Sequence, residues 1–234
     1  MDQHICEATL IVVAHPDDEV LGAGGTASIL SQSRDVHVCI LSGHAAARAH
    51  RPSDDELLAD TLKATAEVGM ETPVFGSFPN IRMNTIDHID LVSFIETRIR
   101  ETGARSIITH HPNDLNDDHR QVSVACQAAA RLSQRGADVD SLKSLLYMEI
   151  PSSTDWAFPN AQSPFSPNGF VELTERHLQK KLDALAHYRH IMREYPHPRS
   201  SEVIRGLAAY RGGQAGLRFA EAFQVAYLDL TPRR

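Results

Sequence analysis

Cysteine is scarce in this chain. Its three cysteines, Cys6, Cys39 and Cys126, stand far apart and form no C-x-x-C pair. An odd number of widely spaced cysteines does not suggest a disulfide framework, which agrees with a cytoplasmic protein. Cys39 lies in an apolar run and Cys126 in a predicted helix, so we expect both to be buried thiols without a chemical role.

Long apolar runs and basic segments are missing as well. No stretch approaches the roughly 20 apolar residues that a bilayer-spanning helix needs, and residues 1–5 lack both the basic and the apolar part of a signal peptide. The formal net charge is −7, and an acidic protein gains nothing from counterion release on DNA or RNA. We therefore expect a cytoplasmic protein that neither inserts into a membrane nor binds nucleic acid.

What the chain does contain is an alternation of short apolar runs and amphipathic segments. Its 234 residues, 42% of them hydrophobic, suffice for one large domain, which we expect to span residues 1–234. The β-branched runs are typical of buried strands, and the predicted strands are 9–14, 36–41, 73–75, 106–109 and 144–150. The predicted helices are 20–30, 54–68, 87–101, 118–133, 174–192 and 200–211, with Asp117 or Asp118 as an N-cap and Gly212-Gly213 ending the last one. This order predicts an α/β fold, a three-layer α/β/α Rossmann-like domain with a mostly parallel sheet.

Polar clusters follow the predicted strands, where parallel sheets bind ligands. The first is His15-Pro16-Asp17-Asp18-Glu19. Imidazole and carboxylate are good ligands for a divalent ion, and three adjacent acids repel one another unless a positive charge lies among them. The alternative is an acidic helix N-terminus, in which Asp and Glu interact favourably with the helix dipole.

A second cluster, residues 110–119, supports the metal interpretation. His119 at the start of a helix would add a third ligand to His15 and Asp18, and two histidines with one carboxylate leave a coordination position open for water, as in catalytic zinc sites. Asp17 would act as general base for that water. Asp114 and Asp118 are candidates to orient a ligand histidine, or else helix caps.

His110 and His111 are adjacent, so in an extended strand they face opposite ways and at most one points into the site. The long segment 151–169 is rich in Pro, Ser and Asn. We expect it to be a loop that, with Trp156 and residues 43–51, shapes the pocket.

The motif Ala14-His15-Pro16-Asp17-Asp18-Glu19 together with Asp118-His119 resembles the LmbE/PIG-L zinc deacetylases. The resemblance covers most of the chain and implies His15, Asp18 and His119 as zinc ligands and Asp17 as the base. Zinc is the expected ion, with Fe²⁺ as the other option. The resemblance also implies that the reaction is removal of acetyl from an N-acetylated amino sugar. Because related proteins are often trimers or hexamers, it further suggests a homo-oligomer.

The chain departs from this family at two places. Asn116 stands where many members have a histidine that polarises the carbonyl group. An amide can still donate to an oxyanion, but the general acid is then left open between Asp17 and either His110 or His111. Many members also bind substrate with an arginine after the second strand; here Arg48 is the first choice and Arg51 the other, with His111 as a further substrate contact.

Other functions fit the sequence less well. Residues 22–27 match G-x-G-x-x-A, but they do not follow the strand at once and no acid closes the second strand, as dinucleotide binding requires. The iron oxygenases that bind their metal with two histidines and one carboxylate are β-jelly rolls, unlike this alternating pattern. A hydrolase of another amide or acyl substrate, or a non-catalytic metal- or sugar-binding module, stays open. Asp17 argues against the module, because a structural site needs no base.

Overall fold

The computed structural model describes residues 7–44, 52–136, 139–158 and 163–231. Strands and helices alternate over most of this length. Their bounds are β1 Thr9–Val13, α1 Asp18–Leu30, β2 Val36–Ile40, α2 Asp54–Glu67, β3 Val74–Phe75, η1 Met83–Thr85, α3 His88–Thr102, β4 Ser106–His110, α4 Asp117–Ala129, α5 Leu132–Arg135, β5 Ser144–Met148, β6 Gly169–Glu172, α6 Glu175–His187, α7 Ser201–Ala215 and β7 Ala220–Leu228. No helix in the described ranges is long and apolar enough to cross a bilayer.

The described strands form one sheet in the order β3-β2-β1-β4-β5-β7-β6. The pairs from β3 to β5 are parallel, whereas β7 runs antiparallel to both β5 and β6. The predicted α/β fold with a mostly parallel sheet is thus confirmed. The antiparallel strands β6 and β7 were not predicted. The β7 segment loses its burial along its length, with its last three residues exposed, so its apolar signal is weak.

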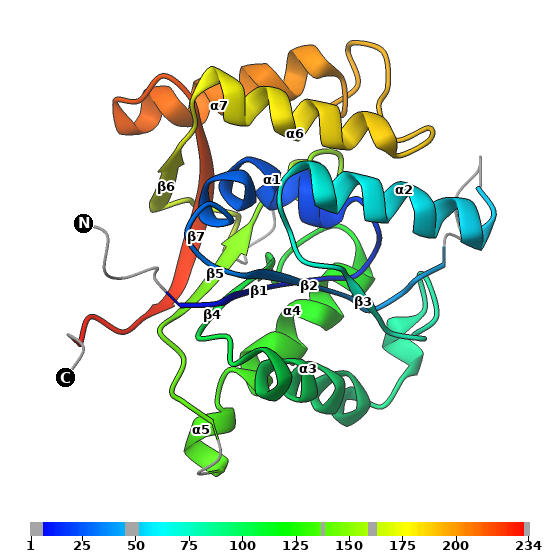
Figure 1. Ribbon diagram of the computed structural model, residues 1–234, viewed down its shortest axis with the longest axis vertical. Coiled ribbons are helices and arrows are strands. Elements are labelled where there is room, and N and C mark those ends of the chain that lie inside the picture. The colour runs from blue at the N-terminus through cyan, green and yellow to red at the C-terminus, as the bar shows by residue number, and fades with distance from the viewer. Residues whose placement is uncertain (1–6, 45–51, 137–138, 159–162, 232–234) are drawn as a thin grey trace.

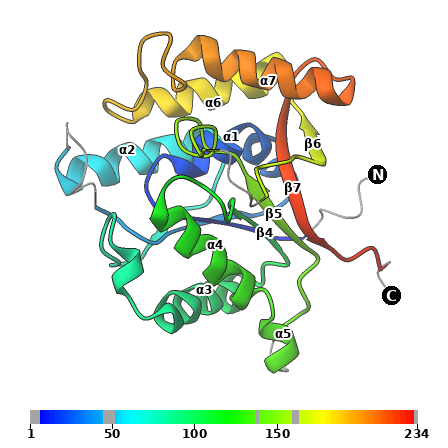
Figure 2. The same cartoon turned by 180° about the vertical axis from the view of Figure 1, so that it is seen from behind.

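Helices cover both faces of the sheet (Figures 1 and 2). One face carries α1 and α2, with α6 packed outside them and α7 against β6 and β7, and the other face carries α3 and α4. Successive residues of the central strands alternate between the two cores: Ile11 and Val13 face α1, and Leu10 and Val12 face α3 and α4. Both faces of these strands are therefore dry, which explains their continuous apolar runs.

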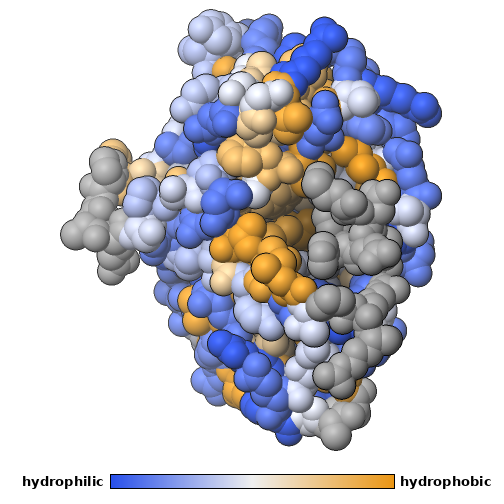
Figure 3. All heavy atoms as spheres, turned by 90° about the vertical axis from the view of Figure 1, so that its left-hand side faces the viewer, coloured by the Kyte–Doolittle hydropathy of each residue, from blue (hydrophilic) through white to orange (hydrophobic). Residues whose placement is uncertain are grey.

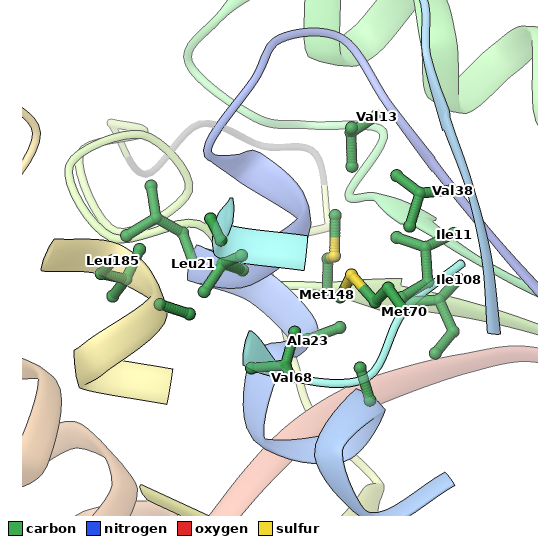
Figure 4. Packing of buried hydrophobic residues seen from close by; sticks show 14 of the residues in the cluster. Ile11, Val13, Leu21, Ala23, Val38, Val68, Met70, Ile108, Met148 and Leu185 are labelled. Atoms are coloured by element: carbon green, nitrogen blue, oxygen red, sulfur yellow. The ribbon is translucent and has the colours of Figure 1, made fainter. Parts of the chain in front are cut away.

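Helix α1 is buried on nearly every side (Figure 4). Leu21 lies near Leu185 of α6, and the opposite side of the helix meets β5. Gly22 allows this close contact, because an added Cβ would lie 2.3 Å from Sδ of Met148 and the methionine would have to move. Close packing of α1 on the sheet fixes the start of the helix above the carboxyl end of β1.

The side of the molecule that carries β6 and β7 is drawn in Figure 3, where apolar side chains gather around a hollow among polar residues. Exposed apolar residues at the end of the chain include Tyr227, Leu228 and Leu230. This side is defined by the antiparallel end of the sheet, whereas the polar clusters follow the parallel strands.

Several predicted helix ends differ from the structure; the helix expected over residues 174–192, for example, ends at His187. Asn116, not Asp117 or Asp118, is the N-cap of α4, since its side chain accepts the N–H of Asp118 at 3.0 Å. The helix expected over residues 118–133 is two helices, α4 and α5. Helix α7 continues through Gly212 and ends before Gly216, whose φ of 71° suits glycine.

Helix α2 does not bury all of its leucines. Leu58 and Leu62 are 43% and 39% exposed, and the buried residues are Leu57, Asp60, Thr61, Ala64 and Thr65. These buried residues also recur at helical spacing, so periodicity alone does not distinguish them from a face that contains Leu58 and Leu62. The hydroxyls of the two threonines donate to the preceding turn at 2.8 and 2.9 Å. The carboxylate of Asp60 accepts the backbone N–H of Arg189 at 3.2 Å.

Candidate metal centre

The predicted ligands meet at the carboxyl ends of β1 and β4. His15 follows β1, Asp18 is the first residue of α1, and His119 lies in the first turn of α4. Neighbouring parallel strands end at the same edge of the sheet, which is why two motifs far apart in the chain converge there. All three side chains are buried.

Oδ2 of Asp18 lies between the two histidine rings. It is 3.4 Å from Nδ1 of His15 and 3.2 Å from Nε2 of His119. It also accepts the backbone N–H of His15 at 3.0 Å. One ligand atom from each residue lies within 4.8 Å of the others, so the three face one point.

The spacing of these atoms fits a small divalent ion. Bonds of about 2.0–2.1 Å to nitrogen and oxygen, arranged tetrahedrally, separate neighbouring ligand atoms by about 3.3 Å. The distances of 3.2 and 3.4 Å agree with this value. Two histidines and one carboxylate suit zinc, and the same donors also suit Fe²⁺.

Two further carboxylates orient the histidines. Nε2 of His15 donates to Asp118 at 2.9 Å, and this directs Nδ1 of His15 toward Asp18. Nδ1 of His119 lies 3.2 Å from Asp114, which directs Nε2 of His119 the same way. Each imidazole thus presents its other nitrogen to the cluster, as metal-ligating histidines do.

Both orienting carboxylates are themselves held in place. Asp118 accepts the backbone N–H groups of Ile81 at 2.6 Å and Met83 at 3.0 Å. Asp114 accepts the hydroxyls of Ser153 and, at 2.6 Å, Thr154. The long loop after β5 therefore reaches the site and fixes Asp114.

The electrostatics of the cluster favour a cation. Burial alone would lower the pKa of His119, but Asp18 and Asp114 raise it to about 10. Burial likewise opposes protonation of His15, yet bonds to Asp118 and Asp18 raise its pKa. Burial would raise the pKa of Asp18, but His119 holds it well below the ordinary value. The carboxylates therefore favour protonated histidines, whose protons a divalent ion would replace.

His110 and His111 face opposite ways, as predicted. The ring of His110 stacks on His119 with centroids 3.8 Å apart, and its Nε2 accepts the N–H of Ala14 at 2.9 Å. Burial, with His119 close by, lowers the pKa of His110 to about 3, so it is neutral. Nδ1 of His111 accepts the N–H of Asn113 at 3.2 Å, and Nε2 lies 3.2 Å from Gln224.

Asp17 has an unusual backbone. Its φ is 103°, a left-handed conformation that Asp tolerates better than most residues. Its N–H donates to Oε2 of Glu19 at 3.0 Å, and Oε1 of Glu19 accepts the hydroxyl of Tyr188. Burial, together with Asp17 and Asp18, raises the pKa of Glu19 to about 8.

Sequence reasoning missed Tyr188 and Arg199. Both come from the last quarter of the chain, and nothing in their local sequence marks them. Nη1 of Arg199 lies 3.4 Å from Oδ2 of Asp17, and Nε donates to Oγ of Ser152 at 2.7 Å. Only the packing of α6 and the segment before α7 over α1 brings them to the site.

Of the remaining predicted residues, Asn116 lies beside the site as the cap of α4. Arg48 and Arg51 lie outside the described residues. Trp156 is 48% exposed and its ring contacts that of His197, with centroids 5.7 Å apart. Cys39 and Cys126 are buried free thiols, as predicted.

Comparisons with solved structures place the fold among known ones. The 4-carboxy-2-hydroxymuconate hydratase of Pseudomonas putida KT2440 superposes with a TM-score of 0.78 at 18% identity, over 97% of this chain and 99% of that chain. A conserved protein of Thermus thermophilus gives 0.77 at 20% identity, over 97% of both. The N,N′-diacetylchitobiose deacetylase of Pyrococcus horikoshii gives 0.76 at 16%, over 94% and 83%.

No curated protein matches the sequence significantly. The family profile described as PIG-L, GlcNAc-PI de-N-acetylase, matches residues 10–130. That region begins in β1, ends just after α4, and holds all three candidate ligands together with Asp17, Asp114 and Asp118. Because the match covers more than half of the chain, the protein belongs to the PIG-L (LmbE-like) de-N-acetylase family.

Proposed function

We propose that the protein is a metal-dependent hydrolase that removes the acetyl group from an N-acetylated amino sugar. His15, Asp18 and His119 would hold zinc, or Fe²⁺ in its place. The observation that carries the proposal is the convergence of these three donors within 4.8 Å of one another, next to Asp17 in the chain, with Oδ2 of Asp18 3.4 Å and 3.2 Å from the nitrogens of His15 and His119. Family membership and the deacetylase among the structural neighbours support the same reaction.

The chemistry needs a base, a donor to the carbonyl oxygen and an acid. A divalent ion at the three donors would supply Lewis-acid activation of water and of the amide carbonyl. Asp17 would take a proton as the water oxygen bonds to the carbonyl carbon. It would then give that proton to the nitrogen as the C–N bond breaks, leaving acetate and the free amine.

Asn116 is assigned as a donor to the developing oxyanion. Its capping bond uses Oδ1, so the Nδ2 hydrogens are the donors for the substrate. Asp118 would act through His15, whose ring it orients. We assign substrate contacts to Arg48, with Arg51 as the alternative, and to His111.

The hydratase among the structural neighbours has the same fold and a different reaction, so the fold alone does not select deacetylation. A measurement of acetate release distinguishes deacetylation from hydration. The test is to load the purified protein with zinc and measure acetate release from a panel of N-acetylated amino sugars, before and after chelation. Release that stops with chelator and returns with zinc supports the proposal; bound zinc with no release from any amide overturns it.

The Asp17→Asn variant separates catalysis from metal binding. We expect it to keep stoichiometric zinc while its kcat falls about 10²–10⁴-fold, the usual contribution of a general base. Asp117→Asn is the matched control. It makes the same change in charge, but Asp117 is paired with Arg120 at the surface of α4. Full activity in Asp17→Asn would contradict the assignment of the base.

A further inference from the structure

Arg199 brings a positive charge to the side of the site formed by Asp17. It lies in the segment between α6 and α7, just before the N-cap Ser200, and outside the part of the chain that the family profile matches. Its side chain is 22% exposed. The guanidinium is thus partly withdrawn from water beside the proposed base.

The guanidinium is fixed in orientation but not saturated. Nε donates to Oγ of Ser152 at 2.7 Å and lies 3.4 Å from the carbonyl oxygen of Pro151. Nη1 makes a long contact of 3.4 Å with Asp17. Among the described residues Nη2 has no hydrogen-bond partner, so one edge of the planar group remains for a ligand.

The turn that holds Arg199 contains Ser152 and Ser153 and has a left-handed backbone. Ser152 has a φ of 68°, and the same turn supplies Ser153 to Asp114. One turn therefore fixes both an orienting carboxylate of the metal centre and the guanidinium. Their relative position is set by neighbouring residues of one segment, as a substrate-binding site requires.

An aromatic pair lies on the same two segments. The backbone N–H of Arg199 donates to Nδ1 of His197 at 3.0 Å, and the His197 ring contacts Trp156. The backbone N–H of Trp156 donates to the carbonyl oxygen of Ser153 at 3.3 Å. Trp156 is half-exposed, and an indole on the segments that hold a guanidinium suits a sugar ring that carries a negative group.

We propose that Arg199 binds an anionic substituent, phosphate or carboxylate, of the substrate, so that the enzyme prefers acidic N-acetyl amino sugars to neutral ones. The substrate preference rests on the proposed function, whereas binding of the anion to Arg199 does not depend on it. A guanidinium suits this role because its planar donors match the oxygens of phosphate and carboxylate. Its place beside Asp17 puts the anionic group close to the scissile amide.

The kinetic test compares charged and neutral substrates. The zinc-loaded enzyme is assayed on N-acetylglucosamine 1-phosphate, N-acetylglucosamine 6-phosphate, N-acetylmuramic acid and neutral methyl N-acetylglucosaminide. We expect a higher kcat/KM for a phosphorylated sugar or for the carboxylate than for the neutral glycoside. The substrate with the highest value shows whether the site prefers phosphate or carboxylate. Arg199→Gln should lower kcat/KM on the preferred acidic substrate by about 10- to 100-fold more than on the neutral glycoside, and this extra loss should appear mainly in KM.

Two further variants give the control. Arg193→Gln removes the same charge from an exposed position of the same segment and should keep the preference. Ser152→Gly suits the positive φ but removes the hydroxyl that holds Nε, so it should lose part of the preference. Equal losses on charged and neutral substrates in Arg199→Gln, or no preference in the unmodified enzyme, would overturn the proposal.

A binding measurement separates this proposal from the deacetylation reaction. Calorimetry of the zinc-loaded protein with glucosamine 1-phosphate and with glucosamine needs no turnover. We expect the phosphate to bind at least about tenfold more tightly, and Arg199→Gln to abolish the difference. If no sugar releases acetate but this selectivity is present, the proposed reaction fails and the anion site stands. Equal binding of the two sugars would refute the anion site.

Discussion

Asp118 accepts a hydrogen bond from Nε2 of His15 at 2.9 Å, across 103 residues of chain. The bond joins the first turn of α4 to the end of β1 and decides which nitrogen of His15 faces Asp18. A carboxylate in this position raises the basicity of a ligand histidine and fixes its ring.

Removing this carboxylate should weaken metal binding without unfolding the protein. In Asp118→Asn the amide cannot accept from His15, Ile81 and Met83 at once, because one of its two terminal atoms is a donor. We expect the zinc Kd, measured by chelator competition, to rise about 10- to 100-fold. Asp117→Asn, which changes the neighbouring residue, should bind zinc as the unmodified protein does. Equal affinity in both variants would show that Asp118 does not orient His15.

Tyr188 should support Asp17 through Glu19. The hydroxyl of Tyr188 is buried and donates to the carboxyl that accepts the N–H of Asp17. Tyr188→Phe should lower the free energy of unfolding by about 1–3 kcal/mol. It should also reduce kcat of the proposed reaction more than it changes zinc affinity, because Asp17 is not a ligand.

Tyr210→Phe is the control for this change, since Tyr210 is 61% exposed. Chemical denaturation, activity and zinc titration of the two variants give the comparison. If kcat of Tyr188→Phe stays at the unmodified level while stability falls, Tyr188 is structural only.

Lys181 and Glu221 form a buried ion pair that α1 depends on. Nζ of Lys181 donates to Glu221 and to the carbonyl oxygen of Leu21, both at 2.7 Å, and Glu221 accepts the N–H groups of Gly25 and Thr26 at 2.9 and 2.6 Å. Lys181→Met would leave the carboxylate buried without its cation. We expect it to destabilise the protein by roughly 3–5 kcal/mol in urea denaturation.

The double variant Lys181→Met with Glu221→Gln should be more stable than Lys181→Met alone, because no buried charge remains. Lys63→Met, at an exposed position of α2, should change stability by less than about 0.5 kcal/mol. A Lys181→Met protein as stable as this control would show that the pair contributes nothing.

The two described thiols should be unreactive in the folded protein. Burial raises the pKa of Cys126 to about 12, and burial together with Cys126 raises that of Cys39 further. At pH 8 both are therefore protonated and shielded. In a Cys6→Ser background, a thiol reagent should label neither cysteine until denaturant is added, and then both. Labelling of either one before unfolding would contradict the burial.

The sequence alone correctly predicted that His15, Asp18 and His119 lie together. Residues 15–19 follow one apolar run and His119 begins a helix after another, so strand ends and helix starts already place the ligands at one edge. It was less successful where polar and apolar residues share a face. In α2 the buried positions include Asp60 and Thr61, whose burial depends on hydrogen bonds that no periodicity reveals.

The family motif, the α/β alternation and the ligand types are properties of short segments, and the sequence by itself determined them. The tertiary structure alone decided which carboxylate orients which histidine, that Tyr188 reaches Glu19 and that Arg199 reaches Asp17. These contacts join residues 103, 169 and 182 positions apart. The first exists because β1 and β4 are neighbours in the sheet, and the other two because α6 and the segment after it pack over α1. Local sequence carries no record of such packing.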